Sequence, residues 1–451
     1  MTAKEFNKKY KLSFNGIQTP FALANNQKTF SNIAGKPKKL LLEILKRFFK
    51  SWPSVLFLIV FIIVLLISII VTISSKYSAN ESISDTISLN LIADQQGKTI
   101  FGPPSIKSLP ASYQPYITLK SAGFEQDIPK YKAAFHENYG GFFDKFLDIS
   151  KDATAASVLK TREYTVQGIN GSTKQSEILI DMYRWYRVYS AYLIFDKSNI
   201  AQNLNQNEYQ SLYDQALALN PQTKLDTFLG TTAKGIDIWT RSWVGTWKAL
   251  RLAFIVASIQ TIIGVIIGAY LGFHVGSKID TIMMRLIDIF SAPPTLIWLL
   301  IAVTLFGTSD LALGIALVVV GWVGSVGGTR LFIITVKDSE FITASKSVGA
   351  SKIRLIYKHA LPGIIGKIAT NYVTQIPSII LSVSSLAFLG FFSSDTDVNL
   401  GEIIFSASSE AAQNFWSLLL PALILLSISV SLYFIALGVH DALDPKVIKT
   451  K

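Results

Sequence analysis

Cysteine is absent from this sequence of 451 residues, and histidine occurs only four times. Without cysteine the chain has neither disulfides nor thiolate metal ligands. The histidines are scattered and no carboxylates cluster, so the sequence predicts neither a metal site nor a catalytic centre. A phosphate-binding loop is also missing: in GIIGKI at 363–368, Leu361 stands at the first glycine position and Ile368 at that of the final Ser or Thr. We expect no enzyme activity, no metal and no cofactor bound by this chain.

Charge is scarce as well, because 16% of the residues are charged and 50% are hydrophobic, with a mean hydropathy of +0.39. This composition is typical of a multi-span membrane protein. Six runs are long enough to cross a hydrocarbon core of about 30 Å. They are residues 53–73, 252–273, 289–306, 311–329, 368–392 and 416–438. The sequence therefore predicts an all-α membrane protein with six transmembrane helices, the third and fourth joined by a turn at 307–310.

The placement of the charges predicts the orientation. The first 52 residues contain 11 Lys or Arg against Glu5 and Glu43, which puts the N-terminus in the cytoplasm. Alternating spans then place residues 330–367, with seven Lys or Arg, inside, and residues 393–415, with none, outside. The net charge of +12 thus indicates topology and attraction to anionic membrane lipid rather than nucleic-acid binding. We expect a multi-pass protein of the cell membrane with both termini in the cytoplasm.

These features divide the chain into consecutive parts. The predicted boundaries are a basic cytoplasmic tail at 1–52, a first span at 53–75, an extracytoplasmic domain at 76–229, a five-span region at 230–445 and a cytoplasmic tail at 446–451. The first span is longer than a signal-peptide core, so we expect a retained anchor. The domain is long enough for its own core, which we expect to be helix-rich. Its aromatic segment at 182–195 favours core packing over a ligand-binding surface.

A tryptophan-rich stripe precedes the second span. Ile236, Trp239, Trp243 and Trp247 recur at helical spacing, and Lys234, Arg241 and Lys248 lie elsewhere around the helix. This pattern predicts an amphipathic segment at the outer headgroup level. A simple aromatic belt that anchors the span is the alternative.

Ionisable groups are nearly absent from the spans, which argues against a proton- or ion-coupled transporter. Uncharged polar residues are present in the spans, namely Gln260, Thr370, Asn371, Thr374, Gln375, Ser378, Ser382, Ser384 and Ser385. They could line a polar pathway or form hydrogen bonds between helices. The residues that line a substrate pathway stay unknown at this stage.

Between the fourth and fifth spans lies the basic segment TASKSVGASKIRLIYKHALPG at 343–363. Phe341, Ala344 and Val348 share one helical face, and Gly349 allows a sharp turn. A second apolar stripe follows before Pro362, which we expect to stop the helix; it consists of Ile353, Ile356, Tyr357, Ala360 and Leu361. Two short helices tied to spans on both sides predict a docking handle for a soluble partner. A helix pair resting on anionic lipid is the alternative.

This segment resembles the EAA loop of ABC importer permeases. Ala344, Gly349, Leu361 and Pro362 fit that pattern, and Thr343 and Ser345 replace its first and third letters. The resemblance implies an ATPase-coupling loop at 336–364. Its site residues would be Phe341, Thr343, Ala344, Ser345, Val348, Gly349, Ala350, Leu361 and Pro362.

Further blocks across 230–445 are similar to the C-type subunit of oligopeptide and dipeptide permeases. GTTAKGIDIWTR at 230–241 resembles that group's GTDxxGRDxxSR pattern but departs from it at Thr232, Ile236 and Thr240. The other blocks are MRLIDIFSAPP at 284–294, LAFLGF at 386–391, LGEII at 400–404 and DALDP at 441–445. Their shared order and spacing carry the assignment to the type I importer permease fold, with 76–229 as a large insertion.

The resemblance implies one subunit of an ATP-driven peptide importer that contributes half of the translocation pathway. Implied partners are a second, B-type permease, two ATP-binding subunits that would carry ATP and magnesium, an extracytoplasmic substrate-binding protein, and the peptide. The extracytoplasmic domain is expected to dock the binding protein. A nickel or other small-solute importer of the same family, and a non-transporting membrane scaffold, are the alternative functions.

Overall fold

The computed structural model describes most of the chain. The described residues are 40–83, 106–122, 128–129, 131–132, 139, 141–150, 157–168, 171–198, 200, 204–219, 224–391 and 399–443. Residues 1–39 of the expected tail at 1–52, the whole expected tail at 446–451, and the end of the DALDP block lie outside these residues.

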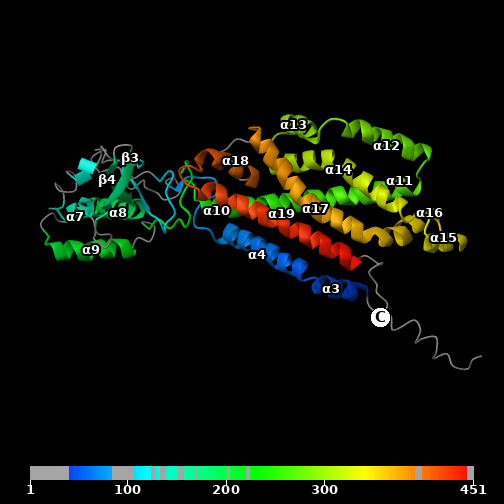
Figure 1. Ribbon diagram of the computed structural model, residues 1–451, viewed down its shortest axis with the longest axis horizontal. Coiled ribbons are helices and arrows are strands. Elements are labelled where there is room, and N and C mark those ends of the chain that lie inside the picture. The colour runs from blue at the N-terminus through cyan, green and yellow to red at the C-terminus, as the bar shows by residue number, and fades with distance from the viewer. Residues whose placement is uncertain are drawn as a thin grey trace, which may run out of the picture.

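Long helices form a bundle that makes up most of the molecule (Figure 1). Its elements are α3 (Leu40–Lys50), α4 (Trp52–Ser74), α10 (Ile238–Ile263), η3 (Gly264–Gly268), α11 (Ala269–Phe273), α12 (Lys278–Ser291), α13 (Thr295–Phe306), α14 (Asp310–Ile334), α15 (Glu340–Ser347), α16 (Lys352–Arg354), η4 (Leu355–Ala360), α17 (Leu361–Phe388), α18 (Leu400–Glu410) and α19 (Trp416–Leu443). Among the described residues, four uninterrupted helical stretches are long and apolar enough to cross a membrane: α4, α10 through α11, α14 and α19. The bent pair of α12 and α13 makes five, so the predicted count of six is not confirmed.

The predicted third span at 289–306 is not one straight helix. The chain bends by 79° between α12 and α13, and α13 contains only 12 residues. Pro293 and Pro294 stand at the bend, where they lack the amide hydrogens that a continuous helix needs. The predicted turn at 307–310 is present: Gly307 has a φ of 87°, and the Ser309 side chain caps α14 by accepting from the amide of Ala312.

Glycines allow α10, η3 and α11 to lie directly against α14. A Cβ atom on Gly264, Gly268 or Gly272 would come within 2.6, 2.5 and 2.6 Å of atoms of α14, respectively. Small residues at such spacing permit close approach of two helices, which is how helices associate within a membrane. This contact fixes the second and fourth predicted spans side by side.

The described residues between 76 and 229 form a separate unit, which we call the head. Its elements are β1 (Tyr116–Thr118), α7 (Asp144–Leu147), β2 (Ile149–Ser150), β3 (Leu159–Gly168), β4 (Gly171–Asp181), α8 (Met182–Lys197) and α9 (Gln206–Leu219). The aromatic segment forms α8 and is buried as predicted: Trp185 and Tyr189 are 0% exposed and pack on Tyr131. Core packing therefore describes this segment better than a ligand surface.

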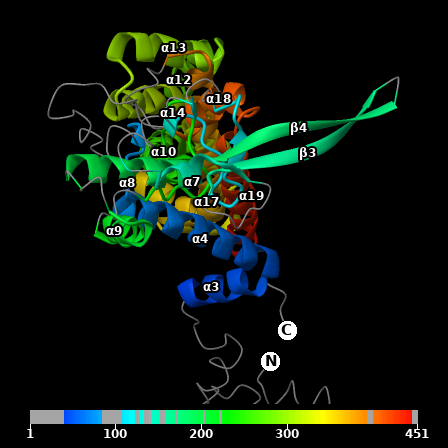
Figure 2. The same ribbon diagram turned by 90° about the vertical axis from the view of Figure 1, so that its left-hand side faces the viewer.

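The head also contains a four-stranded sheet in the order β1-β4-β3-β2, so the prediction of an all-α fold is wrong here. Most of it is the antiparallel hairpin of β3 and β4, which projects from the body (Figure 2). Residues 159–168 are rich in Thr, Tyr and Val, which favour a strand. In the register of the hairpin Gly168 pairs with Gly171. The composition of β3 was thus a signal for a strand in the sequence.

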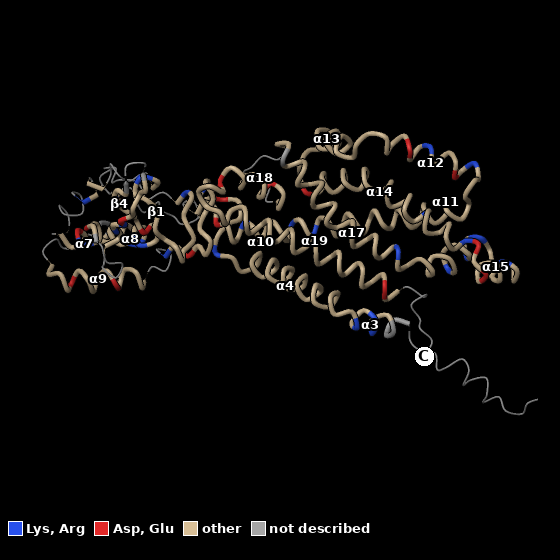
Figure 3. Tube along the Cα trace, in the orientation of Figure 1, with Lys and Arg blue, Asp and Glu red and all other residues tan. Residues whose placement is uncertain are grey.

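The head lies at one end of the molecule and α15 at the other, which we call the loop end (Figure 1). The ends of the described chain, at α3 and at the close of α19, lie toward the loop end. Lys and Arg gather there on α3, α12 and the segment around α15, whereas few charges lie along the middle of the bundle (Figure 3). This relative placement agrees with the predicted charge asymmetry.

Candidate functional site

The candidate site is the segment from α15 to η4 at the loop end. Helix α15 ends at Ser347, and Gly349 turns the chain with a φ of 85°, as predicted. In this left-handed region only glycine is unstrained. The short first helix and the glycine turn are confirmed, whereas the second helix is not short, because α16 and η4 continue into α17.

Buried apolar residues fasten this segment to the bundle. Ile342 on α15 is 2% exposed, and Leu355 and Ile356 on η4 are 2% and 0% exposed. They form one cluster with Ala269 of α11, Ile333 of α14, and Ile364 and Ile368 of α17. The Tyr357 hydroxyl donates to the Ile266 carbonyl at 2.8 Å, which adds a link to η3. The segment is therefore attached to four bundle elements.

Other apolar residues of the same segment point away from the bundle. Phe341, Val348 and Ile353 are 48%, 90% and 67% exposed, and we call them the loop patch. The predicted second stripe is thus divided, because Ile353 is exposed while Ile356 is buried. Exposed large apolar groups beside basic residues are typical of a protein or membrane contact surface.

The remaining predicted site residues lie in the same segment with different surroundings. Thr343 and Ser345 are on α15, and their hydroxyls donate to carbonyls one turn earlier, at Ser339 and Phe341. Ala344 is exposed, and Ala350 is half-buried against the cluster that anchors the segment. The hydroxyl groups of α15 are therefore bonded to carbonyls of the preceding turn.

Pro362 does not stop the helix, contrary to the prediction. The π-helical turn η4 runs directly into α17, and Leu361 and Pro362 are its first two residues, Leu361 half-buried and Pro362 exposed. The amide of Leu361 donates to the carbonyl of Ile356, five residues back. Proline has no amide hydrogen, so the Pro362 position lacks the backbone bond of a regular helix. The helix nevertheless continues from α16 through η4 into α17.

A second polar site, which the sequence reasoning left without a role, joins the head to the bundle through residues 230–241, called the joint segment here. Gly230 has a φ of 84°, and a Cβ atom there would collide with the Leu109 carbonyl of the head. The Thr231 hydroxyl donates to the Ile106 carbonyl and accepts from the Leu109 amide. The family block GTTAKGIDIWTR was the available signal, since it contains both the glycine and the threonine.

The joint segment continues into α10. The Asp237 side chain caps α10 by accepting from the Thr240 amide at 2.8 Å, and burial raises the pKa of that carboxyl. Arg241 Nη2 donates to Glu402 Oε2 of α18 at 2.7 Å, with both side chains 5% exposed. Asn414 donates to the carbonyls of Leu109 and Leu229 at 2.9 and 3.0 Å. The head, α10 and α18 are consequently locked together by buried polar contacts.

The predicted surface helix around the tryptophan stripe is not separate. Helix α10 begins at Ile238 and continues without a break into the second predicted span. Trp239 and Trp243 have ring centroids 5.6 Å apart, and both belong to the bundle core. Trp243 is buried because it packs between helices. The tryptophan stripe therefore contributes to helix packing at the start of α10.

The polar residues of the predicted spans fall into two groups. Gln260 and Gln375 make hydrogen bonds between helices, to the Leu317 carbonyl at 2.8 Å and to the Ser325 hydroxyl at 3.0 Å. Thr374, Ser378, Ser382 and Ser385 of α17 instead donate to carbonyls of their own helix. Thr370 does both, since its hydroxyl lies 2.9 Å from the Gly366 carbonyl of α17 and 3.4 Å from the Ala436 carbonyl of α19. Gln260, Gln375 and Thr370 therefore support the hypothesis of helix-to-helix bonding.

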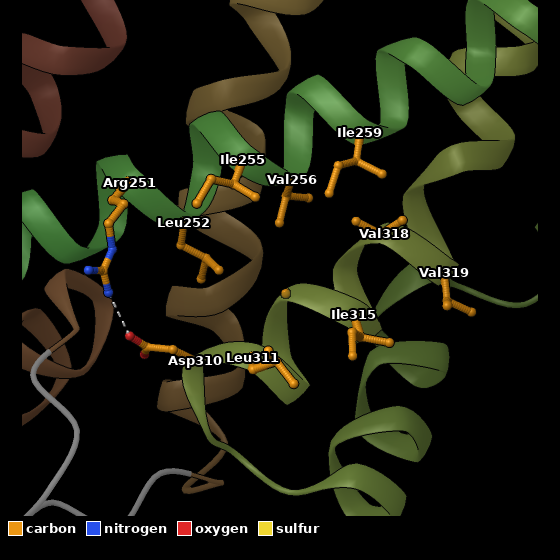
Figure 4. Close-up of a pocket in the computed structure, with 11 residues that line it drawn as sticks. Arg251, Leu252, Ile255, Val256, Ile259, Asp310, Leu311, Ile315, Val318 and Val319 are labelled. Atoms are coloured by element: carbon orange, nitrogen blue, oxygen red, sulfur yellow. Dashed lines mark hydrogen bonds and ion pairs between the residues drawn. The ribbon is translucent and has the colours of Figure 1, made fainter.

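An apolar groove of about 520 Å³ lies between α10 and α14 (Figure 4). Arg251 and Asp310 form an ion pair of 3.1 Å at one end, and aliphatic side chains of both helices face each other along the rest. The groove holds no converging polar groups that could bind a polar substrate. In the described part of the chain, no group of three or more His, Asp or Glu side chains could hold a metal ion.

Comparisons with known proteins agree with the resemblance seen in the sequence. Residues 264–449 match the family described as "Binding-protein-dependent transport system inner membrane component". The oligopeptide transport system permease protein OppC of Mycoplasma pneumoniae is 39% identical over 227 residues, which are 49% of this chain and 60% of the relative. OppC of Haemophilus influenzae is 32% identical over 38% of this chain and 54% of its own length.

A dipeptide relative is matched over more of its length. The dipeptide transport system permease protein DppC of Bacillus subtilis is 32% identical over 239 residues, which are 53% of this chain and 73% of the relative. The match to the oligopeptide relatives spans little more than half of their length.

Proposed function

The chain belongs to the family of binding-protein-dependent transport system inner membrane components, and from this membership we propose that it is the C-type permease subunit of an ABC importer for oligopeptides or dipeptides. The relatives are oligopeptide and dipeptide permease proteins, which favours peptides over nickel or another small solute. The proposed assembly contains a second, B-type permease, two ATP-binding subunits that carry ATP and magnesium, and an extracytoplasmic binding protein. This chain would contribute half of the pathway and no ATP hydrolysis.

In the proposed topology the loop end faces the cytoplasm and the head lies outside. Four helical stretches meet the length and apolarity of a span, and α12 with α13 and α17 would supply the other two of six. Lys and Arg at the loop end support this orientation (Figure 3). The head would then be the extracytoplasmic insertion at 76–229.

One observation carries the coupling role: the loop patch is exposed on a segment whose other side is buried in the bundle. Phe341, Val348 and Ile353 offer an apolar surface to a soluble partner, and Ile342 and Ile356 hold the segment rigidly. Because η4 continues into α17, movement of a bound ATPase would shift a whole membrane helix. The loop patch is thus the proposed ATPase-docking surface.

The coupling proposal is tested by purifying the tagged chain in mild detergent with whatever subunits accompany it. We expect ATP-binding subunits and a second permease with the native chain, and loss of the ATP-binding subunits from Gly349→Val, because valine is strained at a φ of 85°. Gly276→Val is the matched control, since Gly276 also has a positive φ, of 82°, and open space around it. Val348→Ser should weaken the association without affecting folding, because Val348 is 90% exposed.

Purification of the native chain without any ATP-binding subunit would refute the proposed function. Equal loss from Gly349→Val and Gly276→Val would mean that strain anywhere at this end is sufficient, and the docking role of the loop patch would fail.

The head is proposed to hold the binding protein near the pathway entrance. Its hairpin projects from the body and is exposed on both faces over residues 162–166 and 172–176. Thr161 pairs with Ile178, so residues 162–177 can be replaced by an Asn-Gly turn without touching the head core. Reduced recruitment of the binding protein and reduced peptide uptake are expected. Unchanged values for both would refute the role of the hairpin.

A further inference from the structure

Polar residues follow one face of α17, which is interrupted by the exposed Leu381. Six residues recur on it at steps of four, three, four, four and three, and we call them the polar stripe: Lys367, Asn371, Thr374, Ser378, Ser382 and Ser385. Such steps place all six on one side of a helix. The stripe extends over 18 residue steps and hence about 27 Å, close to the thickness of a hydrocarbon core.

The opposite face of α17 is apolar and packed. Ile376 and Ile380 are each 1% exposed, and Leu386 is 0% exposed. On the polar face Thr374, Ser378 and Ser385 are exposed, and Leu381, which is 50% exposed, interrupts them. The helix therefore has the pattern of a helix at the surface of a water-soluble protein, with an apolar inside and a polar outside.

Helix α4 shows how this chain builds a surface for lipid. Between its two ends, its exposed side chains are Leu56, Ile59, Ile62, Ile63, Leu66, Ile70 and Ile73. No Lys, Asn or Gln occurs in α4, whereas the stripe of α17 contains the half-buried Asn371 and Lys367, whose Nζ donates to the Thr335 hydroxyl at 3.3 Å. Charged and amide side chains within a membrane face a protein or a water-filled cavity rather than lipid. The exposed face of α17 is thus not built for hydrocarbon.

The hydroxyl groups of the stripe are oriented in a common way. Ser378 donates to the Thr374 carbonyl at 3.3 Å, Ser382 to the Ser378 carbonyl at 2.9 Å, and Ser385 to the Leu381 carbonyl at 2.9 Å. Each hydroxyl hydrogen is thereby used within the helix, and the oxygen lone pairs remain available as acceptors. The stripe offers a row of uncharged acceptors about one helical turn apart.

We propose that the polar stripe lines this chain's side of a water-filled pathway and that its hydroxyls accept hydrogen bonds from the backbone amides of extended peptides in transit. The inference rests on the proposed peptide-import function and adds the surface that the peptide contacts. Every peptide has backbone N–H groups whatever its side chains, so uncharged acceptors suit a substrate of variable sequence. The bonds are individually weak in water, which lets the peptide move on.

The absence of cysteine allows a direct test on the assembled transporter. A charged, water-soluble thiol reagent is added to transporters that carry one cysteine each. The stripe variants are Thr374→Cys, Ser378→Cys and Ser385→Cys. The lipid-facing controls on α4 are Ile62→Cys and Leu66→Cys. Thiols react as thiolates, which form in water and not in hydrocarbon, so the stripe positions should react at least about tenfold faster than the controls. A saturating transported peptide should slow the stripe reactions and leave the controls unchanged.

Stripe positions that react as slowly as those on α4 would overturn the inference, because lipid or the second permease would then cover the stripe. Reaction that is fast but insensitive to peptide would also overturn it. As a second measurement, Ser378→Ile should lose peptide uptake and Ser378→Thr should retain it, since only threonine keeps an acceptor oxygen; equal uptake would count against the stripe.

Uptake and ATPase co-purification are recorded in parallel for every variant. If both are normal while the stripe is unreactive, only the stripe inference fails. If the native chain neither binds an ATPase nor supports uptake, the proposed function fails.

Discussion

Replacing Glu402 by alanine should destabilise the chain by roughly 3–5 kcal/mol, the range for removing one partner of a buried ion pair. Arg241 Nη2 and Glu402 Oε2 are 2.7 Å apart, and both side chains are only 5% exposed. Without the carboxylate, the guanidinium stays in a site from which water is excluded. The effect is measured as the free energy of unfolding in a denaturant titration of the purified chain in mixed micelles.

A double replacement and an exposed ion pair serve as controls for this experiment. The double replacement Arg241→Met with Glu402→Leu should be far less harmful than either single one, because no charge is then left buried. Lys132→Ala is the exposed control: Lys132 is 2.8 Å from Asp148, but the two side chains are 45% and 61% exposed, so about 0–1 kcal/mol is expected. A loss below about 1 kcal/mol for Glu402→Ala, or a double variant as unstable as the single ones, would refute the argument.

Three other substitutions test local features of the fold by the same titration. Asp237→Ala should cost about 1 kcal/mol through loss of the α10 cap, whereas Asp237→Asn should be nearly neutral, because asparagine caps equally well and burial already raises the pKa of this carboxyl. Gly268→Ala should lower the free energy of unfolding by about 1–3 kcal/mol, because the added Cβ would lie 2.5 Å from a carbonyl of α14. Gly324→Ala is the control: Gly324 has open space around it, so the substitution should not destabilise the protein. Tyr357→Phe should cost about 0.5–1.5 kcal/mol by removing the hydrogen bond to Ile266, and an unchanged stability would show that this link is dispensable.

Local sequence was sufficient for the apolar helices and for the turns. A run of about 20 apolar residues satisfies its own backbone hydrogen bonds in lipid by forming a helix. Helices α4, α14 and α19 could therefore be predicted from composition alone. Gly307 and Gly349 marked turns because only glycine is unstrained at their positive φ. The Thr, Tyr and Val residues of β3 and the Pro-Pro pair after α12 are equally local signals, for a strand and for a bend.

Tertiary structure alone decided how distant residues meet and which way each face points. Arg241 and Glu402 are 161 positions apart, and no periodicity relates them. The spacing of Thr374 and Ser378 along a helix was visible in the sequence, but a stripe can face a neighbouring helix, lipid or water. Only the packing of the opposite face, with Ile380 buried, showed that the stripe points outward. Sequence determines the pattern on each helix, and the assembled bundle determines its direction, because burial is a property of neighbours.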